Sequence, residues 1–432
     1  MANNGWHEVR LGDVVDDITV GHVGPMTHEY VPNGVPFLRS TNILPYRISF
    51  DDIRYIGVEF HEKLKKSRLS PGDVVIVRTG KPGTATVIPI ELADANCSDL
   101  VIVRSGNRVN PRFLAFFING VAAHQVSSHL VGAVQQHFNV ESARQLTIAL
   151  PTRKEQDRIA DILGVLDDKI ELNRRTNETL ESLARALFKS WFIDFDPVHA
   201  KAAGHKPVGV DPATAAVFPD HFADSDLGKI TKGWKAGSVP DAFEINPTRS
   251  LSKGLVAPYL EMSNMPTASM RALAWEDREF GSGMRFINGD ALIARITPCL
   301  ENGKTAYVDF LEDGQVGWGS TEYIVMRSKP PLPTACAYFL ARTDDFRAHV
   351  IQNMTGTSGR QRAPAECLNK YQFVMPSEQV ARRFGELIAP MLSTMKTNDE
   401  ESASLAAARD ALLPKLLNGE ISSAYKKVAH HE

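Results

Sequence analysis

The sequence predicts an α+β protein in which two similar mixed α/β domains are joined by two long, antiparallel coiled-coil helices. Three observations support this fold. Five sequence blocks of the first half recur in the same order in the second half. Each copy starts with short β-type runs between Gly and Pro turns, and each ends in one long amphipathic segment. At 432 residues, the chain is also too long for one ordinary core.

The internal repeat sets the expected domain limits. The matching blocks are "WHEVRLGDV" and "KGWKAGSVPD", "PFLRSTNI" and "PYLEMSNM", "SPGDVVIVRTGKPG" and "INGDALIARITPCLENGK", "CSDLVIVRS" and "STEYIVMRS", and "ESARQLTIALP" and "ECLNKYQFVMP". Between the copies lies a segment rich in Pro, Gly and Asp, the composition of a linker. We therefore expect a first domain at 1–151, a central helix at 152–195, a linker at 196–233, a second domain at 234–376, a second helix at 377–419 and a tail at 420–432.

The two long segments carry the same apolar seam. In the first, the seam runs from Ile159 to Trp191 with 4-3-4-3 spacing, which is the heptad pattern of a coiled coil. An offset of 225 residues gives the second seam, from Phe384 to Leu416. If the ends of the second domain lie close together, the second helix runs back along the first, so the pair is antiparallel and related by a pseudo-twofold axis. The alternative is two ordinary amphipathic helices, each packed on its own domain.

Two central steps of each seam are polar. They are Asn173 and Asn177 in the first helix, and Asn398 and Ser402 in the second. An antiparallel pair would place Asn173 opposite Ser402 and Asn177 opposite Asn398. A buried polar layer costs stability but can fix helix register. Replacing Asn177 and Asn398 together by Leu is therefore expected to raise stability and to loosen the register.

Composition excludes several classes of protein. With 43% hydrophobic and 23% charged residues, no long apolar run and no signal peptide, the sequence predicts a soluble, cytoplasmic protein. The net charge of −3 does not mark a nucleic-acid binder, so any such contact must use local patches. The four cysteines form no CxxC pair, so buried thiols are expected rather than a metal site.

Catalytic motifs are missing from the sequence. It contains no GxGxxG or GxxxxGKS phosphate loop, no Asn-Pro-Pro-Tyr motif, no HExxH and no GxSxG. Asp194 and Asp196 have no further ligands nearby, so a helix-terminating turn is expected there. We therefore predict no catalytic residue, no metal ligand and no directly bound cofactor.

Five stretches resemble the DNA-specificity subunit of Type I restriction–modification enzymes, and the resemblance covers nearly the whole chain. They are "LPTRKEQDRIADILGVLDDKIELNRRTNETLESLARALFKSWFIDFDPV", "FPDHFADSDLG", "VGAVQQHFNV", "GTSGRQR" and "LLPKLLNGEI". The resemblance implies two target-recognition domains that each read one half of a split, asymmetric DNA site, with two helices as a ruler for the gap. The seam spans roughly 50 Å at about 1.5 Å per residue, more than one turn of B-DNA at about 34 Å. The second helix departs from the family pattern, since "PSEQVARRFGELIAPML" lacks the fuller start seen at Glu155–Ile159.

The resemblance also implies partners. It implies a non-catalytic subunit that docks two modification subunits, which bring S-adenosylmethionine, and associates with ATP-driven restriction subunits. Adenine methylation and restriction would then be directed to the DNA site that this chain reads. Two other classes remain open: a self-sufficient DNA methyltransferase or nuclease, and a protein–protein scaffold built on the coiled coil without DNA reading.

Candidate DNA contacts lie in two pairs of aligned loops. Arg and Lys suit guanine in the major groove, and Asn and Gln suit adenine. The first pair of loops offers Arg360, Gln361 and Arg362 in "GTSGRQR", with no competing acid in the loop, and Gln135, Gln136 and His137 in "VQQHF". The second pair follows expected strands, where cations could position phosphates, and offers Arg78 and Lys81 in "VRTGKPG" and Arg295 and Lys304 in "ARITPCLENGK". Ordinary surface turns are the alternative for both pairs.

Overall fold

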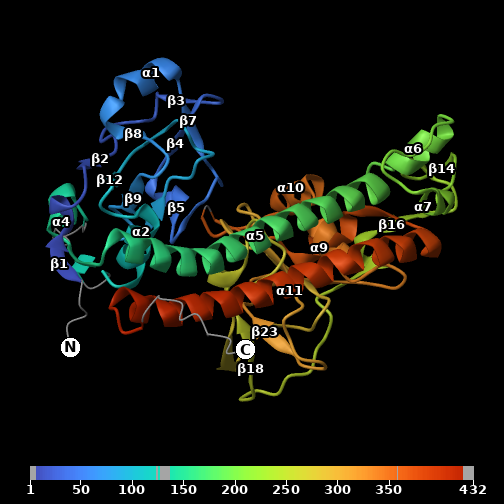
Figure 1. Cartoon of the computed structure of the whole chain (residues 1–432). Coiled ribbons are helices and arrows are strands. Elements are labelled where there is room, and N and C mark those ends of the chain that lie inside the picture. Colours follow the sequence, from blue (N-terminus) through green and yellow to red (C-terminus); the bar gives the residue numbers. More distant parts are fainter. Residues whose placement is uncertain (1–5, 123–124, 127–136, 358, 422–432) are drawn as a thin grey trace, which may run out of the picture. The chain divides into compact units, whose positions relative to one another are not determined.

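The chain divides into two compact units, which are described here separately. The computed structural model in Figure 1 describes residues 6–122, 125–126, 137–357 and 359–421. The first unit comprises residues 1–172 with 401–432, and the second comprises residues 173–400. Each unit therefore contains one mixed α/β domain and one part of each long helix.

The domain of the first unit is built on two sheets. A four-stranded sheet has the order β10-β9-β12-β2, and a five-stranded sheet has the order β3-β7-β4-β11-β8. Separate pairs are formed by β1 with β13 and by β5 with β6. The strands are β1 (His7–Arg10), β2 (Asp17–Val20), β3 (Tyr30–Val31), β4 (Val35–Leu38), β5 (Ile43–Leu44), β6 (Arg47–Ile48), β7 (Arg54–Ile56), β8 (Arg68–Leu69), β9 (Val74–Val77), β10 (Ala85–Val87), β11 (Ala95–Cys97), β12 (Leu100–Arg104) and β13 (Thr147–Leu150). The short helices are α1 (Val58–Lys63), α2 (Pro111–Gly120) and α4 (Val140–Gln145).

The central strand β9 explains how this domain is layered. Its four residues are all buried, because alternate side chains of a strand point to opposite faces and both faces are covered. Val74 and Ile76 belong to the core that contains α2, and Val75 and Val77 belong to the core between the two sheets. A continuous apolar run, rather than an alternating one, is therefore the pattern that this strand requires.

The domain of the second unit repeats this plan. Its sheets have the orders β17-β24-β21-β22 and β19-β18-β23-β20, and β16 pairs with β25. The strands are β16 (Lys235–Ser238), β17 (Phe243–Ile245), β18 (Val256–Leu260), β19 (Glu276–Glu279), β20 (Met284–Phe286), β21 (Ala291–Ala294), β22 (Thr305–Tyr307), β23 (Gly317–Gly319), β24 (Tyr323–Ser328) and β25 (Gln372–Met375). The helices are α8 (Val239–Ala242), α9 (Cys336–Ala341) and α10 (Asp344–Gln352).

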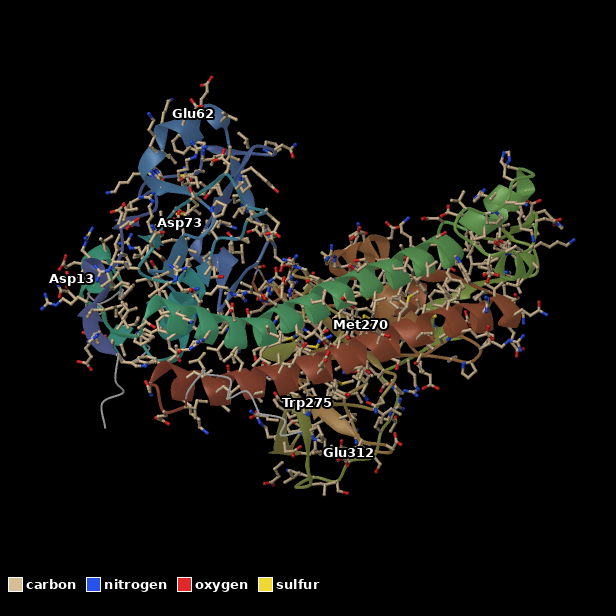
Figure 2. All side chains as sticks on the ribbon, viewed as in Figure 1. Asp13, Glu62, Asp73, Met270, Trp275 and Glu312 are labelled. Carbon is tan, nitrogen blue, oxygen red and sulfur yellow. The ribbon has the colours of Figure 1, made fainter. Side chains whose placement is uncertain are left out.

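The predicted duplication is confirmed strand by strand. The five repeated sequence blocks fall on β1 and β16, β4 and β18, β9 and β21, β12 and β24, and β13 and β25. In both units the central strands lie in equivalent order, and β4–β11 and β18–β23 are both parallel pairs. Even a turn is repeated: Asp73, labelled in Figure 2, accepts a hydrogen bond from the Ser70 amide, and Asp290 accepts one from the Ile287 amide.

The long helices α5 (Arg153–Phe192) and α11 (Glu378–Leu417) lie side by side in each unit (Figure 1). They begin and end within three residues of the expected limits. Their antiparallel direction follows from their contacts, since Asp167 pairs with Arg409 in the first unit and Asn177 pairs with Asn398 in the second. The α+β fold with an antiparallel helix pair is thus confirmed.

The seam residues of both helices are also buried against the domains. Ile159 and Leu416 belong to the core of the first domain, and Trp191 and Phe384 belong to the core of the second. The two expectations, a helix–helix seam and helices packed on their own domains, are therefore not exclusive. One apolar stripe makes both kinds of contact.

The segment that was expected to be a linker is a folded part of the second unit. It forms α6 (Asp196–Ala202), α7 (Pro212–Ala216), β14 (Phe222–Ser225) and β15 (Gly228–Thr231). Val198 and Phe218 are buried in the core of this unit, and the Phe218 ring lies 4.8 Å from the Trp191 ring in an edge-on contact. The linker prediction was wrong because the Pro, Gly and Asp residues mark turns between short elements.

Asp211 fixes this segment to α11. Its carboxylate caps α7 by accepting hydrogen bonds from the amides of Ala213 and Thr214, and it lies 3.4 Å from Arg383. The hydrogen bonds from Thr214 lower the pKa of Asp211 to about 2. Because this pKa is below its ordinary value of 3.8, the stabilisation is present above that pH and is lost as the pH falls towards 2.

Replacing Asp211 by Ala is therefore expected to lower the unfolding temperature at neutral pH by a few degrees, and to have almost no effect near pH 2. Thermal unfolding at a series of pH values measures the difference. Asp224→Ala, on exposed strand β14, is the matched control and should change little. An equal loss at both ends of the pH series would mean that the carboxylate charge is not what stabilises the segment.

Candidate nucleic-acid interface

In the second unit, the two candidate loops form one site. Arg295 follows strand β21, and its backbone carbonyl accepts a hydrogen bond of 2.8 Å from the Ala363 amide. The Thr297 amide donates to the Gln361 carbonyl at 3.0 Å. The loop that holds Arg362 is thus hydrogen-bonded, like an added strand, to the chain that leaves β21.

Glu322 lies at the centre of this site. It directly precedes β24, and its carboxylate accepts a hydrogen bond of 2.7 Å from Nε of Arg362. Nε of Arg295 lies 3.8 Å from the other carboxylate oxygen. The "GTSGRQR" loop itself contains no acid, as expected, but Glu322 supplies one from outside the loop. Glu322 is 40 residues away in sequence, and the pairing of β21 with β24 brings it to the loop.

The carboxylate holds one edge of the Arg362 guanidinium. The side chain is 45% exposed, and Nη1 lies 3.4 Å from the backbone carbonyl of Arg360. A guanidinium held through Nε has less rotamer freedom, while its Nη groups can still donate to a second, planar acceptor. Arg360 itself is exposed and Gln361 is half-buried.

The first unit has an equivalent site. Arg78 follows β9, Asp99 directly precedes β12, and Nη1 of Arg78 donates to the Asp99 carboxylate at 3.1 Å. The Thr79 hydroxyl donates to the same carboxylate. The Phe138 amide donates to the Arg78 carbonyl at 3.1 Å, as the Ala363 amide donates to Arg295 in the other unit. An arginine and a carboxylate therefore recur at matching positions of the two domains, and in each the arginine carbonyl accepts a hydrogen bond from a backbone amide, of Phe138 or of Ala363.

Asp99 also has a strained backbone. Its φ is +52°, in the left-handed region that residues other than glycine rarely adopt. Such a conformation costs on the order of 1–3 kcal/mol and persists only where the surroundings fix it. Here Arg78 and Thr79 hold the side chain. Strain of this kind is frequent at ligand sites, which supports a binding role for this corner of the domain.

The remaining candidates differ in their surroundings. Lys81 is exposed, and His137 is half-buried beside Phe138. Lys304 donates to the Met262 carbonyl at 2.6 Å, which holds its ammonium group in the domain and counts against a phosphate contact. Gln135 and Gln136 lie outside the described residues.

The two carboxylates are visible in the repeated sequence. Asp99 and Glu322 occupy the same position in the repeated blocks "CSDLVIVRS" and "STEYIVMRS". An acid that recurs next to a matched strand in both copies could have been paired with the arginine that recurs after the neighbouring strand. Strand order, which places these two ends together, was the missing information.

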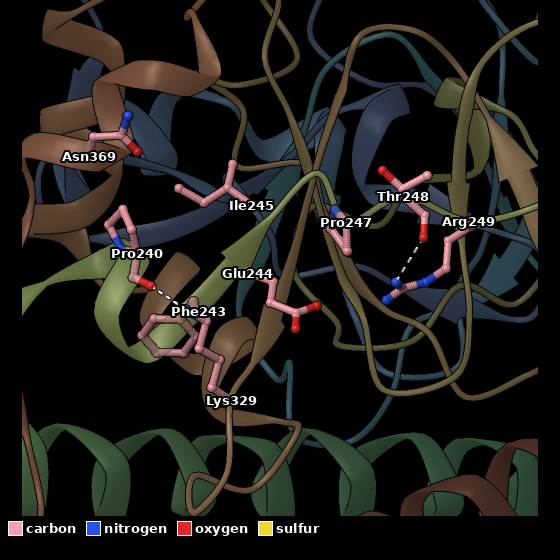
Figure 3. Close-up of a pocket in the computed structure, with 9 residues that line it drawn as sticks. All are labelled: Pro240, Phe243, Glu244, Ile245, Pro247, Thr248, Arg249, Lys329 and Asn369. Carbon is pink, nitrogen blue, oxygen red and sulfur yellow. Dashed lines mark hydrogen bonds between the residues drawn. The ribbon is translucent and has the colours of Figure 1, made fainter.

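A hollow of about 550 Å³ in the second domain has no clear ligand (Figure 3). Its two cations are already held: Lys329 donates to the Pro240 carbonyl at 2.6 Å, and Arg249 contacts the buried Asp290. Within the described ranges there is no group of three or more His, Cys, Asp or Glu that could hold a metal ion. In the same part of the chain, none of the helices is long and apolar enough to cross a membrane.

Two domains of matching topology, each with an arginine and a carboxylate at the same strand ends, define a duplicated protein with two candidate binding sites. Residues 3–182 match the family described as the Type I restriction modification DNA specificity domain. Over these residues the chain is similar to the DNA-specificity subunits of Type I restriction–modification enzymes.

Known proteins resemble the chain over most of its length. It is 24% identical to the Type I restriction enzyme HindI specificity subunit of Haemophilus influenzae, over 96% of this chain and 99% of that protein. It is 23% identical to the MjaIX specificity subunit of Methanocaldococcus jannaschii, over 67% of this chain and 64% of that protein. The S subunit of a Type I restriction–modification system from M. genitalium shares the fold, with a TM-score of 0.52 and 14% identity over 96% of this chain and 97% of that one.

Proposed function

We propose that this chain is the non-catalytic subunit that selects the DNA target of a Type I methylation and restriction complex. In this proposal each domain reads one half of a bipartite site, and the helix pair sets the gap between the halves. The observation that carries it is the recurrence of an arginine beside a carboxylate at matching strand ends of both domains, Arg78 with Asp99 and Arg295 with Glu322. The neighbouring loops differ in sequence, so the half-sites should differ too, whereas two identical readers would select a palindrome.

The chemistry of the sites supports base reading by the second domain. A guanidinium that is held along Nε can present its Nη groups to the O6 and N7 acceptors of guanine. Arg362 meets this condition, because Glu322 binds its Nε. With a net charge of −3, the chain would have to bind DNA through local groups such as Arg360 and Arg362 rather than through its overall charge.

Partner subunits are part of the proposal. Two modification subunits would bring S-adenosylmethionine and methylate adenine, and restriction subunits would use ATP; the cytoplasm is the expected location. Exposed apolar residues on α5 support a docking role for the helices. Val165 is 67% exposed and Leu172 is 58% exposed. Large apolar side chains on a helix face that no domain covers are typical of protein–protein contacts.

Methylome sequencing of cells that express this chain with its modification subunit tests the function. We expect methylated adenines in a bipartite, asymmetric motif with one fixed gap. A contiguous palindrome, or no motif, would contradict the proposal. The two alternatives give other results: a self-sufficient enzyme would show turnover as a purified chain, and a scaffold would leave the DNA targets unchanged when residues 1–150 are exchanged for a related domain.

The ruler role of the helices has its own test. One heptad added to α5 after Leu172 and one added to α11 after Glu400 lengthen each helix by about 10 Å. We expect the gap to change by up to about three base pairs at 3.4 Å each, while both half-sites keep their sequence. Altered half-sites with an unchanged gap would argue against the ruler.

A further inference from the structure

In the second unit, one loop of the domain is attached to both long helices. The loop follows β18 and ends at Met270 and Arg271. The Met270 amide donates to the Glu181 carboxylate of α5 at 2.7 Å, and Nη1 of Arg271 donates to the Asp399 carboxylate of α11 at 2.5 Å. Figure 2 shows Met270 beside the helix pair. The contact is buried, since the Arg271 side chain is 8% exposed and Glu181 is 6% exposed.

This contact continues into the polar layer of the helix pair. The second oxygen of Asp399 accepts a hydrogen bond of 2.7 Å from Nδ2 of Asn177, and Nδ2 of Asn398 donates to Oδ1 of Asn177 at 2.8 Å. Nε of Arg271 also donates to Asp309 of the domain at 2.6 Å. A continuous network therefore runs from the domain through Arg271 and Asp399 to the amides in the seam.

The first unit has a comparable contact at the equivalent loop. Tyr46 lies in the turn between β5 and β6, and its ring is 4.6 Å from the guanidinium carbon of Arg409 on α11. Nη1 of Arg409 donates to Asp167 of α5 at 2.9 Å. Tyr46 has a φ of +66°, a strained value for a residue that is not glycine. In both units, the loop after the same repeated block thus contacts a charged residue of α11 that also binds α5.

We propose that these two loops, residues 43–48 and 266–271, are docking loops that fix the position of each domain on the helix pair. The inference rests on the proposed function, because the position of each reader then sets the gap between the half-sites. Apolar packing between the domains and the helices is non-directional and tolerates small shifts. Hydrogen bonds between ionised groups need defined distances and angles, so a slip or rotation breaks them. Arg271 is bound through two of its nitrogen atoms to two carboxylates, which restricts the orientation of its side chain.

The test replaces Arg271 by Met in the full methyltransferase complex and sequences the methylome. We expect methylation at sites whose gap is one base pair too long or too short to rise about tenfold relative to sites with the correct gap, which corresponds to about 1.4 kcal/mol. Both half-site sequences should stay unchanged. Arg271→Lys keeps the charge and should restore part of the discrimination. Arg347→Met removes an exposed ion pair with Asp344 of the same unit, and serves as the matched control.

Two further variants keep the test decisive if Arg271→Met does not fold. Arg271→Met with Asp399→Asn and Asp309→Asn removes both carboxylate charges that would be left without their partner, and Tyr46→Leu disrupts the contact of the other unit. Each should broaden the gap distribution without changing the half-sites. A folded variant with the wild-type gap distribution would overturn the docking role. If the wild-type complex shows no bipartite motif, the proposed function fails, and that result is separate from the comparison of variants.

Discussion

Replacing Arg360 and Arg362 by Ala is expected to relax one half of the DNA target and to leave the other half unchanged. Both residues lie in the loop that is hydrogen-bonded to the chain after β21, in the second domain only. Each lost bidentate base contact costs about 1–3 kcal/mol, which is about 5-fold to 150-fold in binding. The methylome of the variant should therefore show degenerate bases at one end of the motif, with the gap preserved.

A substitution at Glu322 distinguishes two possible roles of Arg362, base reading and electrostatic attraction of phosphate. Glu322→Gln keeps the size of the side chain but removes the ionised partner of Nε of Arg362. If Arg362 only attracts phosphate, the loss of a neighbouring negative charge should strengthen DNA binding at every sequence. If Arg362 reads a base, a less fixed guanidinium should weaken discrimination at one position of the motif. The measurement is the affinity for the cognate site relative to a site altered in one half, at several salt concentrations.

A matched control completes the comparison. Arg347→Ala removes another exposed arginine of the second unit that pairs with an acid, Asp344, outside the loop. It should leave both half-sites intact. If the Arg360 and Arg362 variant weakens both half-sites equally, these residues bind phosphate or support folding, and the assignment of the second site to base reading is wrong.

The fold was predictable from the sequence because the duplication gives two different sequences for each helix or strand. A short run such as "DVVIVRTG" is ambiguous alone, but its match to "DALIARI" assigns both as central strands, β9 and β21. The heptad seam likewise recurs in both copies, on α5 and on α11. The linker prediction failed because composition cannot distinguish a flexible connection from turns that pack on a core. Phe218, which is buried in the core of the second unit, is the residue in this segment that indicates such packing.

The candidate sites were only partly predictable. Sequence reasoning found Arg78, Arg295 and Arg362, because cations in loops after strands are visible along the chain. It did not find Asp99 or Glu322, since an acid partner is identified by strand order rather than by sequence distance. The heptad pattern also assigned the polar seam residues to contacts between the two helices only, whereas hydrogen bonds connect them to the domain as well.

The connection of the polar layer to Arg271 changes the expected effect of Asn177→Leu with Asn398→Leu. From the heptad pattern, this double substitution should raise stability. In the structure, Asn177 also donates to the Asp399 carboxylate and to the Met395 carbonyl. Burial raises the pKa of Asp399, so its charged form already lacks part of the solvation that it has in water. Without Asn177, the carboxylate loses a further hydrogen bond.

The magnitudes favour a loss of stability. Each buried Leu contributes about 1.5–3 kcal/mol, but a larger side chain in a packed seam costs about 1–3 kcal/mol, and an unsatisfied buried group costs about 1–3 kcal/mol more. The steric cost applies to each of the two leucines, and the cost of the lost hydrogen bond applies once, at Asp399. We therefore expect the free energy of unfolding at neutral pH to fall by about 1–2 kcal/mol, and the gap distribution to broaden as in Arg271→Met.

The pH dependence of the stability difference tests whether Asp399 causes the loss of stability. A carboxyl group with a raised pKa in the folded state destabilises that state increasingly as the pH rises from the ordinary value of 3.8 to the raised one, and we expect the double substitution to raise the pKa of Asp399 further. The stability difference between wild type and variant should therefore be larger at about pH 8 than at about pH 4, where more of Asp399 is protonated. Adding Asp399→Asn should remove most of this pH dependence. A double variant that is more stable than wild type at every pH, with an unchanged gap, would mean that the polar layer fixes neither the helix register nor the domain.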